Sequence, residues 1–469
     1  MNKRKREFKI ISFLMSVLLL GIVVLSTNIS EKLAWNYDMT LDQVFTLSIQ
    51  SEGIMDELEE EIKITAVYPD GSEDKMISTL LSEYDKYSEN IVVSYIDIER
   101  NPASLASLNL ENAQAVSNGT IVVQSSTREK ILTDSSMYTS ADSGNAFSGE
   151  RLITGAITYV TTDEMPVVYI TSGHSEADTT NEFLGAVQAL ELAAYDVQEL
   201  NLLQKGEVPA DAAAVIIPSP KKDLSLDEYN ALLDYFNGGG KAMFLFDAMS
   251  TNTLVLENFN NLLNLYGVDI HNNFVVEEDS DHYTGNNNMY LIPGYVYHSI
   301  TENLAEDRNY VVLPIAMGLQ SVSYDETECR VDYLLLSSTN SWMRTDVTIE
   351  ATSKTDADVD GSIPLAAGIV KSNAKYGATD TKIVVIGNSS FVYTSNIEAQ
   401  GNRDFFISCA NWLAGGSETS STISSKIINA DVFIVRGSDF ARLSILCVVV
   451  LPLIAFIGAF MVWIFRRNQ

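Results

Sequence analysis

Four polar side chains follow a strongly apolar run near the middle of the chain, and their types could support binding or acid–base chemistry. They are Ser172, His174, Ser175 and Glu176. The preceding run, Val167–Ile170, predicts a buried strand, and open α/β sheets bind ligands just beyond the carboxyl ends of their strands. Hydroxyl, imidazole and carboxylate groups in one loop can bind a polar ligand or transfer a proton. The alternative is structural, with Gly173 making the turn while His174 and Glu176 hydrogen-bond neighbouring loops.

A second group of carboxylates resembles the start of a calcium-binding loop. Asp356, Asp358 and Asp360 alternate along the chain and Gly361 follows, as in the first six positions of an EF-hand. The acidic residue required at position twelve is absent, because Ala367 stands there. A solvated acidic loop is the alternative to this weak calcium site, and we expect no bound metal. The four histidines lack the spacing of a zinc site.

The residues needed for covalent or nucleotide chemistry are absent from the expected places. An amidotransferase would need a cysteine on a strand-to-helix turn, and the turns after Ile217 and Phe246 contain none. The three cysteines, Cys329, Cys409 and Cys447, form no CxxC pair, and whether the first two form a disulfide stays open. No Walker A motif is present, so any ATP-driven role requires another subunit. We therefore expect a protein that is not an enzyme and carries no cofactor.

Residues 30–135 alternate between the two periodicities of an α/β domain. The expected elements, in order, are a strand at 62–68, a helix at 76–87, a strand at 91–98, a short helix at 101–108 and a hairpin at 121–132. This β-α-β-α-β-β order is that of a thioredoxin-like domain, here without redox cysteines. Residues 136–165 are expected to be a linker, rich in Ser, Thr, Asp and Gly up to residue 149, followed by a connecting helix at 152–160.

A second α/β domain is expected over residues 166–420. Strands at 167–170, 197–200, 213–217, 242–246 and 382–386 alternate with amphipathic helices. This alternation predicts a parallel sheet with helices on both faces. A helix at 403–413 closes the domain. The stretch from about 270 to 375 is expected to be an insertion, less regular than the rest and richer in Asn, Asp and Ser.

Two long apolar runs stand near the ends of the 469-residue chain. Ile10–Leu25 follows a cluster of four basic residues, and Leu443–Ile464 precedes Arg466 and Arg467. Because cytoplasmic flanks are rich in Lys and Arg, we expect a two-pass protein of the cell membrane with both termini in the cytoplasm. The membrane helices would lie within 1–29 and 443–469, with a juxtamembrane segment at 421–442 and a large extracytoplasmic part before it. A cleaved signal peptide is the alternative for the first run.

The chain is strongly acidic. Asp and Glu number 62 against 30 Lys and Arg, which gives a formal net charge of −32. Such a surface repels nucleic acid and anionic lipid head groups, so nucleic-acid binding is excluded.

Several short motifs stand in an order that matches a known family. They are Asp38–Thr40, Thr46–Ser48, Ile96-Asp97, Asn101-Pro102, Gly149-Glu150, Tyr169–Glu176, Gly387–Phe391, Asn402–Phe406 and Asn411–Leu413. Together with the two terminal apolar runs, they make the chain resemble the gliding-motility-type ABC-transporter auxiliary proteins, the GldG-like family, over nearly its whole length. The resemblance implies that the second domain is similar to flavodoxin-like, glutamine-amidotransferase-like and intraflagellar-transport-type folds.

The resemblance also implies a membrane-anchored auxiliary subunit of the bacterial cell envelope that works with an ABC-2-type permease and a cytoplasmic ATPase. It would bind a substrate or an envelope partner, and Asn388 and Ser389, in the motif that closes a strand, join the contact candidates. The family's usual motifs read Gly-His-Gly-Glu and Gly-Asp, and the departures at Ser175 and Asn388 weaken the case for a charged catalytic site. The rival function is a membrane-anchored amidotransferase-like or hydrolytic enzyme using the His174 loop. A purely structural envelope protein is a third.

Overall fold

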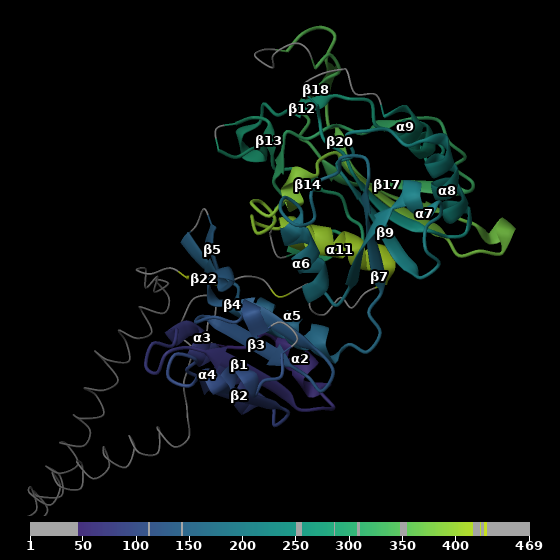
Figure 1. Cartoon of the computed structure of the whole chain (residues 1–469). Helices are drawn as coiled ribbons and strands as arrows, with labels where there is room; N and C mark the ends of the chain where they lie inside the picture. The colour runs from purple at the N-terminus through teal and green to yellow at the C-terminus, as the bar shows by residue number, and fades with distance from the viewer. Residues whose placement is uncertain are drawn as a thin grey trace, which may run out of the picture. The chain divides into compact units, whose positions relative to one another are not determined.

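The computed structural model of this chain describes most of its central part (Figure 1). The described residues are 46–110, 113–141, 144–249, 256–285, 287–306, 310–347, 354–415, 423 and 426–428. Those up to Lys426 belong to one compact unit. Both apolar runs that we expect to cross a membrane lie outside the described residues. Within the described part, no helix is long and apolar enough to span a bilayer.

A four-stranded mixed sheet forms the core of the first domain. Its strands are β1 (Ile62–Val67), β2 (Ile91–Ile96), β3 (Thr120–Gln124) and β4 (Glu129–Thr133), in the order β2-β1-β3-β4. β1 runs parallel to β2, and β3 runs antiparallel to both β1 and β4. Because β1 is central, five of its six residues are buried. The strands lie where the hydrophobic pattern predicts them, except that β2 ends two residues early.

The helices of this domain follow from local sequence signals. They are α2 (Ile49–Asp56), α3 (Lys75–Tyr87), α4 (Pro102–Ala106) and the 3-10 turn η1 (Ala113–Ala115). Asp74 caps α3, because its carboxylate accepts hydrogen bonds from the backbone N–H of Met76 (2.8 Å) and Ile77 (3.0 Å). Four α3 side chains at the spacing of one helix face are buried, namely Ile77, Leu80, Leu81 and Tyr84.

The segment expected to be a linker has secondary structure instead. It contains η2 (Asp134–Met137) and an antiparallel hairpin of β5 (Tyr138–Ala141) and β6 (Gly144–Phe147). The polar composition is misleading here because a few apolar side chains are enough to hold the hairpin in place. Met137 and Phe147 are buried, and the rings of Tyr138 and Phe147 lie 5.3 Å apart. The connecting helix is confirmed as α5 (Gly149–Thr161), which packs on β3 and β4.

A mixed eight-stranded sheet carries the second domain, in the order β14-β17-β20-β21-β10-β9-β7-β8. The five strands predicted from the alternating pattern are β7 (Val167–Ser172), β8 (Asp196–Asn201), β9 (Ala212–Pro218), β10 (Lys241–Leu245) and β21 (Thr381–Ile386). These five are parallel to one another, as predicted. Their carboxyl ends therefore meet at one edge of the sheet, which we call the carboxyl edge.

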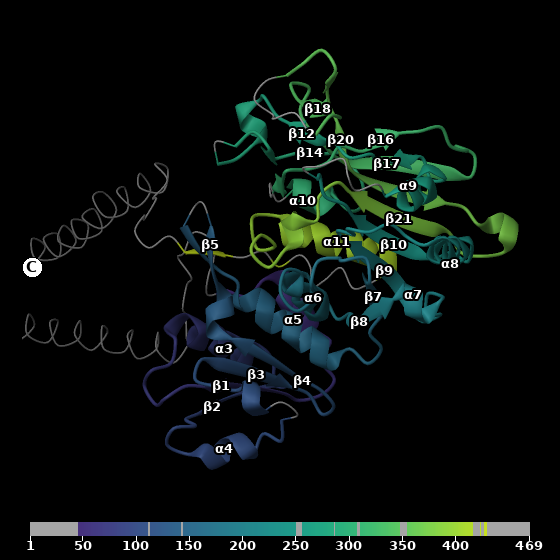
Figure 2. The same ribbon diagram turned by 45° about the horizontal axis from the view of Figure 1, so that its top comes forward.

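Helices cover both faces of this sheet (Figure 2). They are α6 (Leu184–Leu192) and α11 (Asn402–Ala414) on one face, and α7 (Leu202–Lys205), α8 (Leu226–Asn237) and α9 (Glu257–Asn264) on the other. Successive β10 residues alternate between the two cores: Met243 packs on the side of Phe405, whereas Phe244 packs on the side of Phe259. Phe244 is fully buried, so truncating it to Ala should cost about 3–5 kcal/mol.

The stretch expected to be a less regular insertion supplies three strands of the main sheet. They are β14 (Gly294–Tyr295), β17 (Cys329–Leu336) and β20 (Pro364–Lys371), and each pairs antiparallel to its neighbour. The sheet is therefore mixed, because the expected insertion adds an antiparallel part to the predicted parallel strands. Leu365–Ile369 is a continuous buried run, which reads as a central strand once β21 is known to lie beside it.

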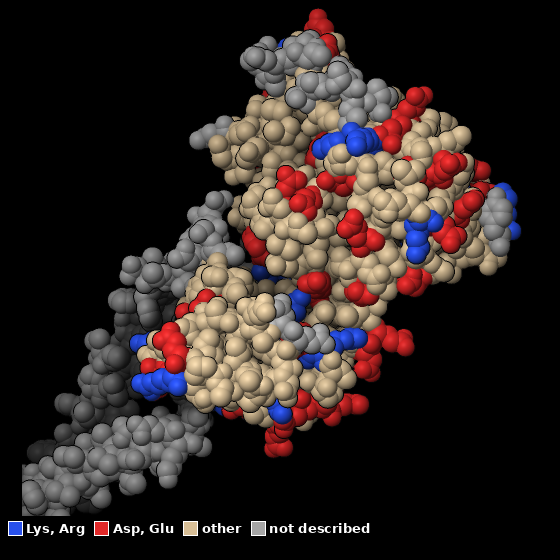
Figure 3. All heavy atoms as spheres, viewed as in Figure 1, with Lys and Arg blue, Asp and Glu red and all other residues tan. Residues whose placement is uncertain are grey.

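The remaining described elements are short. They are β11 (Val268–Asp269), β12 (Phe274–Val276), η3 (Ser280–His282), β13 (Tyr290–Leu291), α10 (Glu302–Glu306), β15 (Leu313–Pro314), β16 (Gln320–Ser321), β18 (Trp342–Arg344), β19 (Val359–Asp360), η4 (Ala374–Tyr376), η5 (Ser390–Val392) and β22 (Lys426–Ile428). Cys329 and Cys409 are both buried free thiols, so the disulfide left open by the sequence is not formed. On the face shown in Figure 3, Asp and Glu are spread widely while Lys and Arg form small groups.

Candidate functional site

The carboxyl edge brings together four loops that are far apart in sequence. They follow β7, β9, β10 and β21. In the sheet, β8 lies on one side of β7, whereas β9, β10 and β21 lie on its other side. The direction in which successive strands are added to the sheet therefore reverses between β7 and β9. Open α/β sheets bind ligands at such a reversal, because the two adjacent loops diverge there. The predicted site loop after β7 stands at this position.

His174 is buried between two carboxylates. Its Nδ1 lies 3.1 Å from Oε1 of Glu176, and its Nε2 lies 3.2 Å from Oε1 of Glu228 on α8. The backbone N–H of His174 donates to the other oxygen of Glu176 at 2.6 Å. Glu228 also caps its own helix by accepting from the backbone N–H and the hydroxyl of Ser225 at 2.9 and 2.7 Å. Both ring nitrogens are thus occupied by protein carboxylates.

The electrostatics of this cluster favour a charged imidazole. The hydrogen bond to Glu176, helped by the charge of Glu228, raises the pKa of His174 above its ordinary value, although burial acts in the opposite direction. Burial alone would raise the pKa of Glu176 and that of Glu228. Hydrogen bonds, from His174 to Glu176 and mainly from Ser225 to Glu228, outweigh burial and lower both values. His174, held between its two carboxylates, fixes the β7 loop against the start of α8.

The other candidates in the β7 loop have different environments. Ser175 is exposed, and its φ of +57° lies in the left-handed region, where the family's usual glycine fits without strain. Ser172 is half-buried, and within the described part of the chain its hydroxyl has no hydrogen-bond partner. The structure therefore gives His174 and Glu176 the contacts of the structural alternative. Ser172 and Ser175 stay predictions as contact residues.

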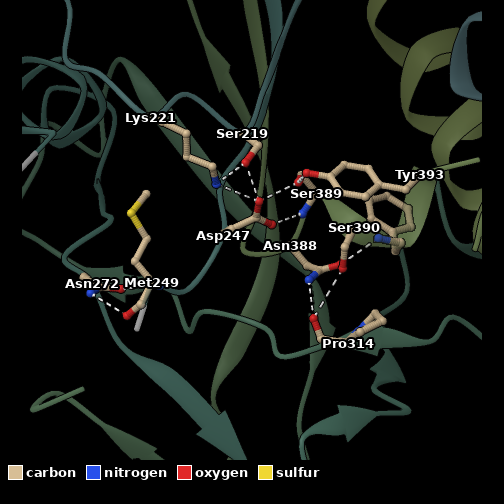
Figure 4. A network of polar contacts seen from close by, with 11 residues as sticks. Ser219, Lys221, Asp247, Met249, Asn272, Pro314, Asn388, Ser389, Ser390 and Tyr393 are labelled. Carbon is tan, nitrogen blue, oxygen red and sulfur yellow. Dashed lines mark hydrogen bonds and ion pairs between the residues drawn. The ribbon is translucent and has the colours of Figure 1, made fainter. Parts of the chain in front are cut away.

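A network of polar side chains lies at the ends of β9, β10 and β21 (Figure 4). Its centre is Asp247, whose carboxylate accepts hydrogen bonds from the backbone N–H of Ser389 at 2.8 Å and from its hydroxyl at 2.7 Å. Asp247 also accepts from the hydroxyl of Ser219 and forms an ion pair with Lys221 at 3.2 Å. Tyr393 completes the set, with its hydroxyl 3.0 Å from that of Ser389. We call these five residues the Asp247 network.

The network is connected to the His174 cluster through the loop after β9. The backbone N–H of Lys221 donates to the carbonyl oxygen of His174 at 2.8 Å. Ser219 lies in the chain between β9 and Lys221. It is almost fully buried, and its φ is +55°. A non-glycine residue in that conformation is held by its surroundings, and here the hydroxyl is bonded to Asp247 and Lys221. The two groups therefore share one loop.

Asn388 and Ser389, the candidates after β21, are both buried. The Asn388 amide donates to the carbonyl oxygen of Pro314 at 2.6 Å and accepts from the backbone N–H of Phe391 at 2.8 Å. Gly387 allows this close packing, because a Cβ there would lie 1.8 Å from the carbonyl oxygen of Met317. Asn388 thus shapes the loop, while Ser389 belongs to the Asp247 network.

Sequence reasoning missed five residues of these groups, namely Ser219, Lys221, Glu228, Asp247 and Tyr393. Ser219 directly follows the last residue of β9, and Asp247 lies two residues beyond β10. The argument that singled out the β7 loop applies equally to these positions, since all parallel strands end at the same edge. Glu228 could be found only through its Ser225 capping box, which gives no hint of His174.

The predicted calcium residues have other partners. Asp358 accepts hydrogen bonds from Arg344 at 3.1 and 2.8 Å, and both side chains are almost fully buried. The Arg344 guanidinium lowers the pKa of Asp358 to about 2. Asp360 pairs with Lys354, and Asp356 is exposed. Among the described residues, no group of three His, Cys, Asp or Glu side chains is placed to hold a metal ion.

A third buried group lies at the start of α5, where Glu150 meets both ends of the described chain. Its Oε2 lies 2.6 Å from the ammonium group of Lys426, which also donates to the carbonyl oxygen of Thr46 at 2.5 Å. Its Oε1 accepts from the backbone N–H of Ser48 at 2.5 Å and from the hydroxyl of Ser51 at 2.7 Å. We call these five residues the Glu150 clamp.

The charge of Glu150 is held by its partners. Burial alone would raise its pKa, but the hydrogen bonds from Lys426 and Ser48 outweigh burial and lower it. The next residue of α5, Arg151, forms an ion pair with Glu398 just before α11. Burial and the nearby Arg151 lower the pKa of Arg403, in α11, to about 10. The first turn of α5 therefore contacts both the terminal segments and the second domain.

Comparison with known proteins identifies the family. A family model described as an ABC-type uncharacterized transport system matches residues 165–409, and a model of a domain of unknown function matches residues 41–136. Since the first match covers more than half of the chain, this protein belongs to that transport family. This confirms the resemblance to ABC-transporter auxiliary proteins and gives the chain an accessory role in ABC transport. No curated protein matches the chain.

Solved structures show weaker similarity. The mmIFT52 N-terminal domain is 16% identical over 53% of this chain and 98% of its own length, with a TM-score of 0.41. A ThuA-like protein from Parabacteroides merdae is 9% identical over 56% of this chain and 100% of its own, with a TM-score of 0.30. The exo-beta-1,4-mannosidase Op5Man5 from Opitutaceae bacterium strain TAV5 is 10% identical over 73% of this chain and 49% of its own, with a TM-score of 0.27.

Proposed function

We propose that this protein is the extracytoplasmic, membrane-anchored auxiliary subunit of an ABC-2-type transport system, working with a separate permease and ATPase. Two membrane helices, Ile10–Leu25 and Leu443–Ile464, keep both termini in the cytoplasm and the acidic folded part outside the cell membrane. The carboxyl edge of the eight-stranded sheet contacts the transported substrate or an envelope partner there. The family match supports the transport assignment.

The observation that carries this proposal is the Glu150 clamp. A two-pass protein with its folded part between two membrane helices needs both ends of that part on the same side. Thr46 lies after the first apolar run and Lys426 before the second, and they are joined by one hydrogen bond over a buried carboxylate. This juxtaposition supports two helices that leave the folded part together.

The contacts of α5 support a role in transmitting movement. Glu150 binds the terminal segments, while its neighbour Arg151 binds Glu398 of the second domain. A displacement of either membrane helix, driven by the permease, would therefore act on the first turn of α5 and through it on the second domain. Chains of packed and hydrogen-bonded groups on rigid elements are the physical means by which such coupling travels.

The strand orders support the finer fold assignments. The order β2-β1-β3-β4, with β3 antiparallel to its neighbours, supports a thioredoxin-like first domain. In the second domain β8-β7-β9-β10-β21 corresponds to the order 2-1-3-4-5 of flavodoxin-like sheets. The remaining strands then belong to the insertion.

The chemistry of the carboxyl edge favours binding over catalysis. A serine nucleophile needs access to substrate and a free general base. Ser219 is only 1% exposed, and its hydroxyl is bonded to Asp247 and Lys221. His174 has both ring nitrogens on carboxylates. The groups that could perform hydrolysis instead fix one another, which supports a non-enzymatic subunit.

Co-purification tests the partners and protease protection tests the topology. The full-length protein, tagged at either terminus and extracted in mild detergent, should recover a permease and an ATPase. In intact protoplasts, external protease should digest the folded part and leave both terminal tags protected. Recovery of the protein alone, or digestion of a terminal tag, contradicts the proposal.

A further inference from the structure

A cavity of about 740 Å³ opens beside the Asp247 network. Its floor is the segment after β10, with Phe246, Asp247 and Met249, and the α9 helix forms one wall. The opposite side comes from the insertion, with lining residues Ile270, His271, Asn272, Met317, Gln320 and Thr345. Its size is within the range of about 300–1,000 Å³ that small-molecule sites occupy, and it lies at the carboxyl edge.

The α9 wall presents a row of polar side chains. Glu257, Asn260, Asn261 and Asn264 recur at the spacing of one helix face, and all line the cavity. Glu257 and Asn261 are exposed. Asn264 lies deeper, and within the described residues its buried Oδ1 has no hydrogen-bond partner.

Other amides hold the cavity in shape. The side chain of Asn272 accepts from the backbone N–H of Met249 at 2.9 Å and donates to its carbonyl oxygen at 3.1 Å (Figure 4). Asn260 accepts from the backbone N–H of Ile270 at 2.8 Å. These bonds fix the floor and one side before any ligand binds, and such preorganisation reduces the entropic cost of binding.

The described lining of the cavity offers little that would bind an anion. Among the described lining residues there is no Lys or Arg, whereas phosphate and carboxylate ligands are bound mainly by such cations. Asp247 is paired with Lys221 just outside the cavity, so its charge is largely balanced. Glu257 remains as an exposed carboxylate at the start of α9. The site is therefore suited to neutral or weakly basic ligands.

The lining combines apolar and amide groups. Phe246, Met249, Leu256, Ile270 and Met317 supply apolar surface. Asn261, Asn264, Gln320 and Thr345 supply groups that can both donate and accept hydrogen bonds, as a hydroxyl group requires of its partner. A sugar ring has this combination of C–H faces and hydroxyl edges.

We propose that the cavity binds one or two sugar rings of a glycan, uncharged or carrying an amine but not an acid. The proposal rests on the auxiliary function above and names the ligand class of its carboxyl edge. Asn261 and Gln320 contact the sugar directly, while Asn260 and Asn272 position the walls.

Binding to defined trisaccharides tests this assignment. The full-length protein would be prepared in a sugar-free amphipol, since maltoside detergents would compete for the site. The probes are N-acetylglucosamine trimer, glucosamine trimer and trigalacturonate, measured by calorimetry. We expect the first two to bind with Kd values of about 1 mM or lower and the acidic trimer to bind at least about tenfold more weakly.

Variants locate the binding. Asn261→Ala combined with Gln320→Leu should weaken binding of the N-acetylglucosamine trimer about tenfold, because two hydrogen bonds are lost. Asn340→Ala is the matched control, since Asn340 is exposed and outside the cavity. Equal binding by the double variant and wild type, equal affinity for trigalacturonate, or no binding of either neutral or basic trimer overturns the proposal.

The result separates the ligand assignment from the proposed function. If the permease and ATPase co-purify with the protein but no trimer binds, the ligand class is wrong and the auxiliary function stands. If the trimers bind but no transporter subunit is recovered, the auxiliary function is wrong.

Discussion

Neutralising Glu150 is a direct test of the clamp that joins the two ends of the folded part. Glu150→Gln keeps the shape of the side chain and removes its charge. Glu150 is only 3% exposed, and its carboxylate accepts hydrogen bonds from Ser48 and Ser51 and forms an ion pair with Lys426. A glutamine side chain has one acceptor oxygen, so its NH₂ group must face at least one of these donors. The variant therefore loses an ion pair and creates a donor–donor contact.

The expected cost follows from the burial of the two partners. Breaking a buried ion pair by removing one charge costs about 3–5 kcal/mol. The Lys426 side chain remains 13% exposed and can regain some water, which places the cost of Glu150→Gln near the lower limit, about 3 kcal/mol. For a domain of 150–250 residues this corresponds to a Tm lower by about 6–12 °C.

The pH dependence gives a second signature. The pKa of Glu150 is lowered on folding, so its contribution is fully present above the ordinary value of 4.5 and is lost as the pH falls through the lower folded value. The stability difference between wild type and Glu150→Gln should therefore be constant near pH 7 and shrink below about pH 4.

Thermal and urea unfolding of the full-length protein, followed by tryptophan fluorescence, measures these effects. Glu257→Gln is the matched control, because Glu257 is exposed and should change stability by less than about 0.5 kcal/mol. Lys426→Met combined with Glu150→Gln should cost less than the sum of the single variants, since neither charge is then left unpaired. A Glu150→Gln loss no larger than that of the control, or strictly additive costs, would refute the clamp.

Three further outcomes follow from the candidate sites. Ser175→Gly should raise stability by about 1 kcal/mol in urea unfolding, because glycine removes the cost of the left-handed backbone at φ +57°. The pKa of His174 is raised on folding above its ordinary value of 6.5, so the advantage of wild type over His174→Gln should be full well below pH 6.5 and be lost as the pH rises through the higher folded value. Asp358→Ala leaves Arg344 buried without its partner and should cost about 3–5 kcal/mol, whereas unchanged stability would contradict the buried pair.

The fold was predictable where local pattern and tertiary packing agree. Apart from the edge strand β8, the strands of the parallel part contain continuous apolar runs because they are buried on both faces. The strand β10 is an example, with its side chains divided between two cores. The hairpin at 138–147 was not predictable from composition, since two buried anchors, Met137 and Phe147, stabilise a segment whose other residues are mostly polar. The strand β20 lies inside the stretch that we expected to be irregular, and its place in the main sheet follows only from its pairing with β17 and β21.

The candidate site was predictable only in part, because its contacts cross the sheet. The β7 loop could be singled out from its own residues. Its continuation could not, since Ser389 and Asp247 are 142 residues apart and meet only because β10 and β21 are neighbours. Strand order is decided by packing between helices on both faces, and the alternation of strands and helices leaves several orders open. Ligands of open α/β sheets nevertheless bind beyond the carboxyl ends of the parallel strands, so the positions to examine are the first polar residues after each parallel strand.

Asp247 belongs both to the Asp247 network and to the floor of the cavity, which would link ligand binding to the order of the loops. A ligand hydroxyl that donates to this carboxylate must share it with Ser219, Lys221 and Ser389, whose loops follow β9 and β21. The Lys221 backbone in turn holds the carbonyl oxygen of His174 in the β7 loop. A change in these bonds when a ligand binds would therefore alter three loops at once. If the ligand changes the affinity of those loops for a partner by some factor, the partner changes the affinity of the cavity for the ligand by the same factor, because linkage is reciprocal. This reciprocity is what a subunit needs if it is to report an occupied site to a transporter.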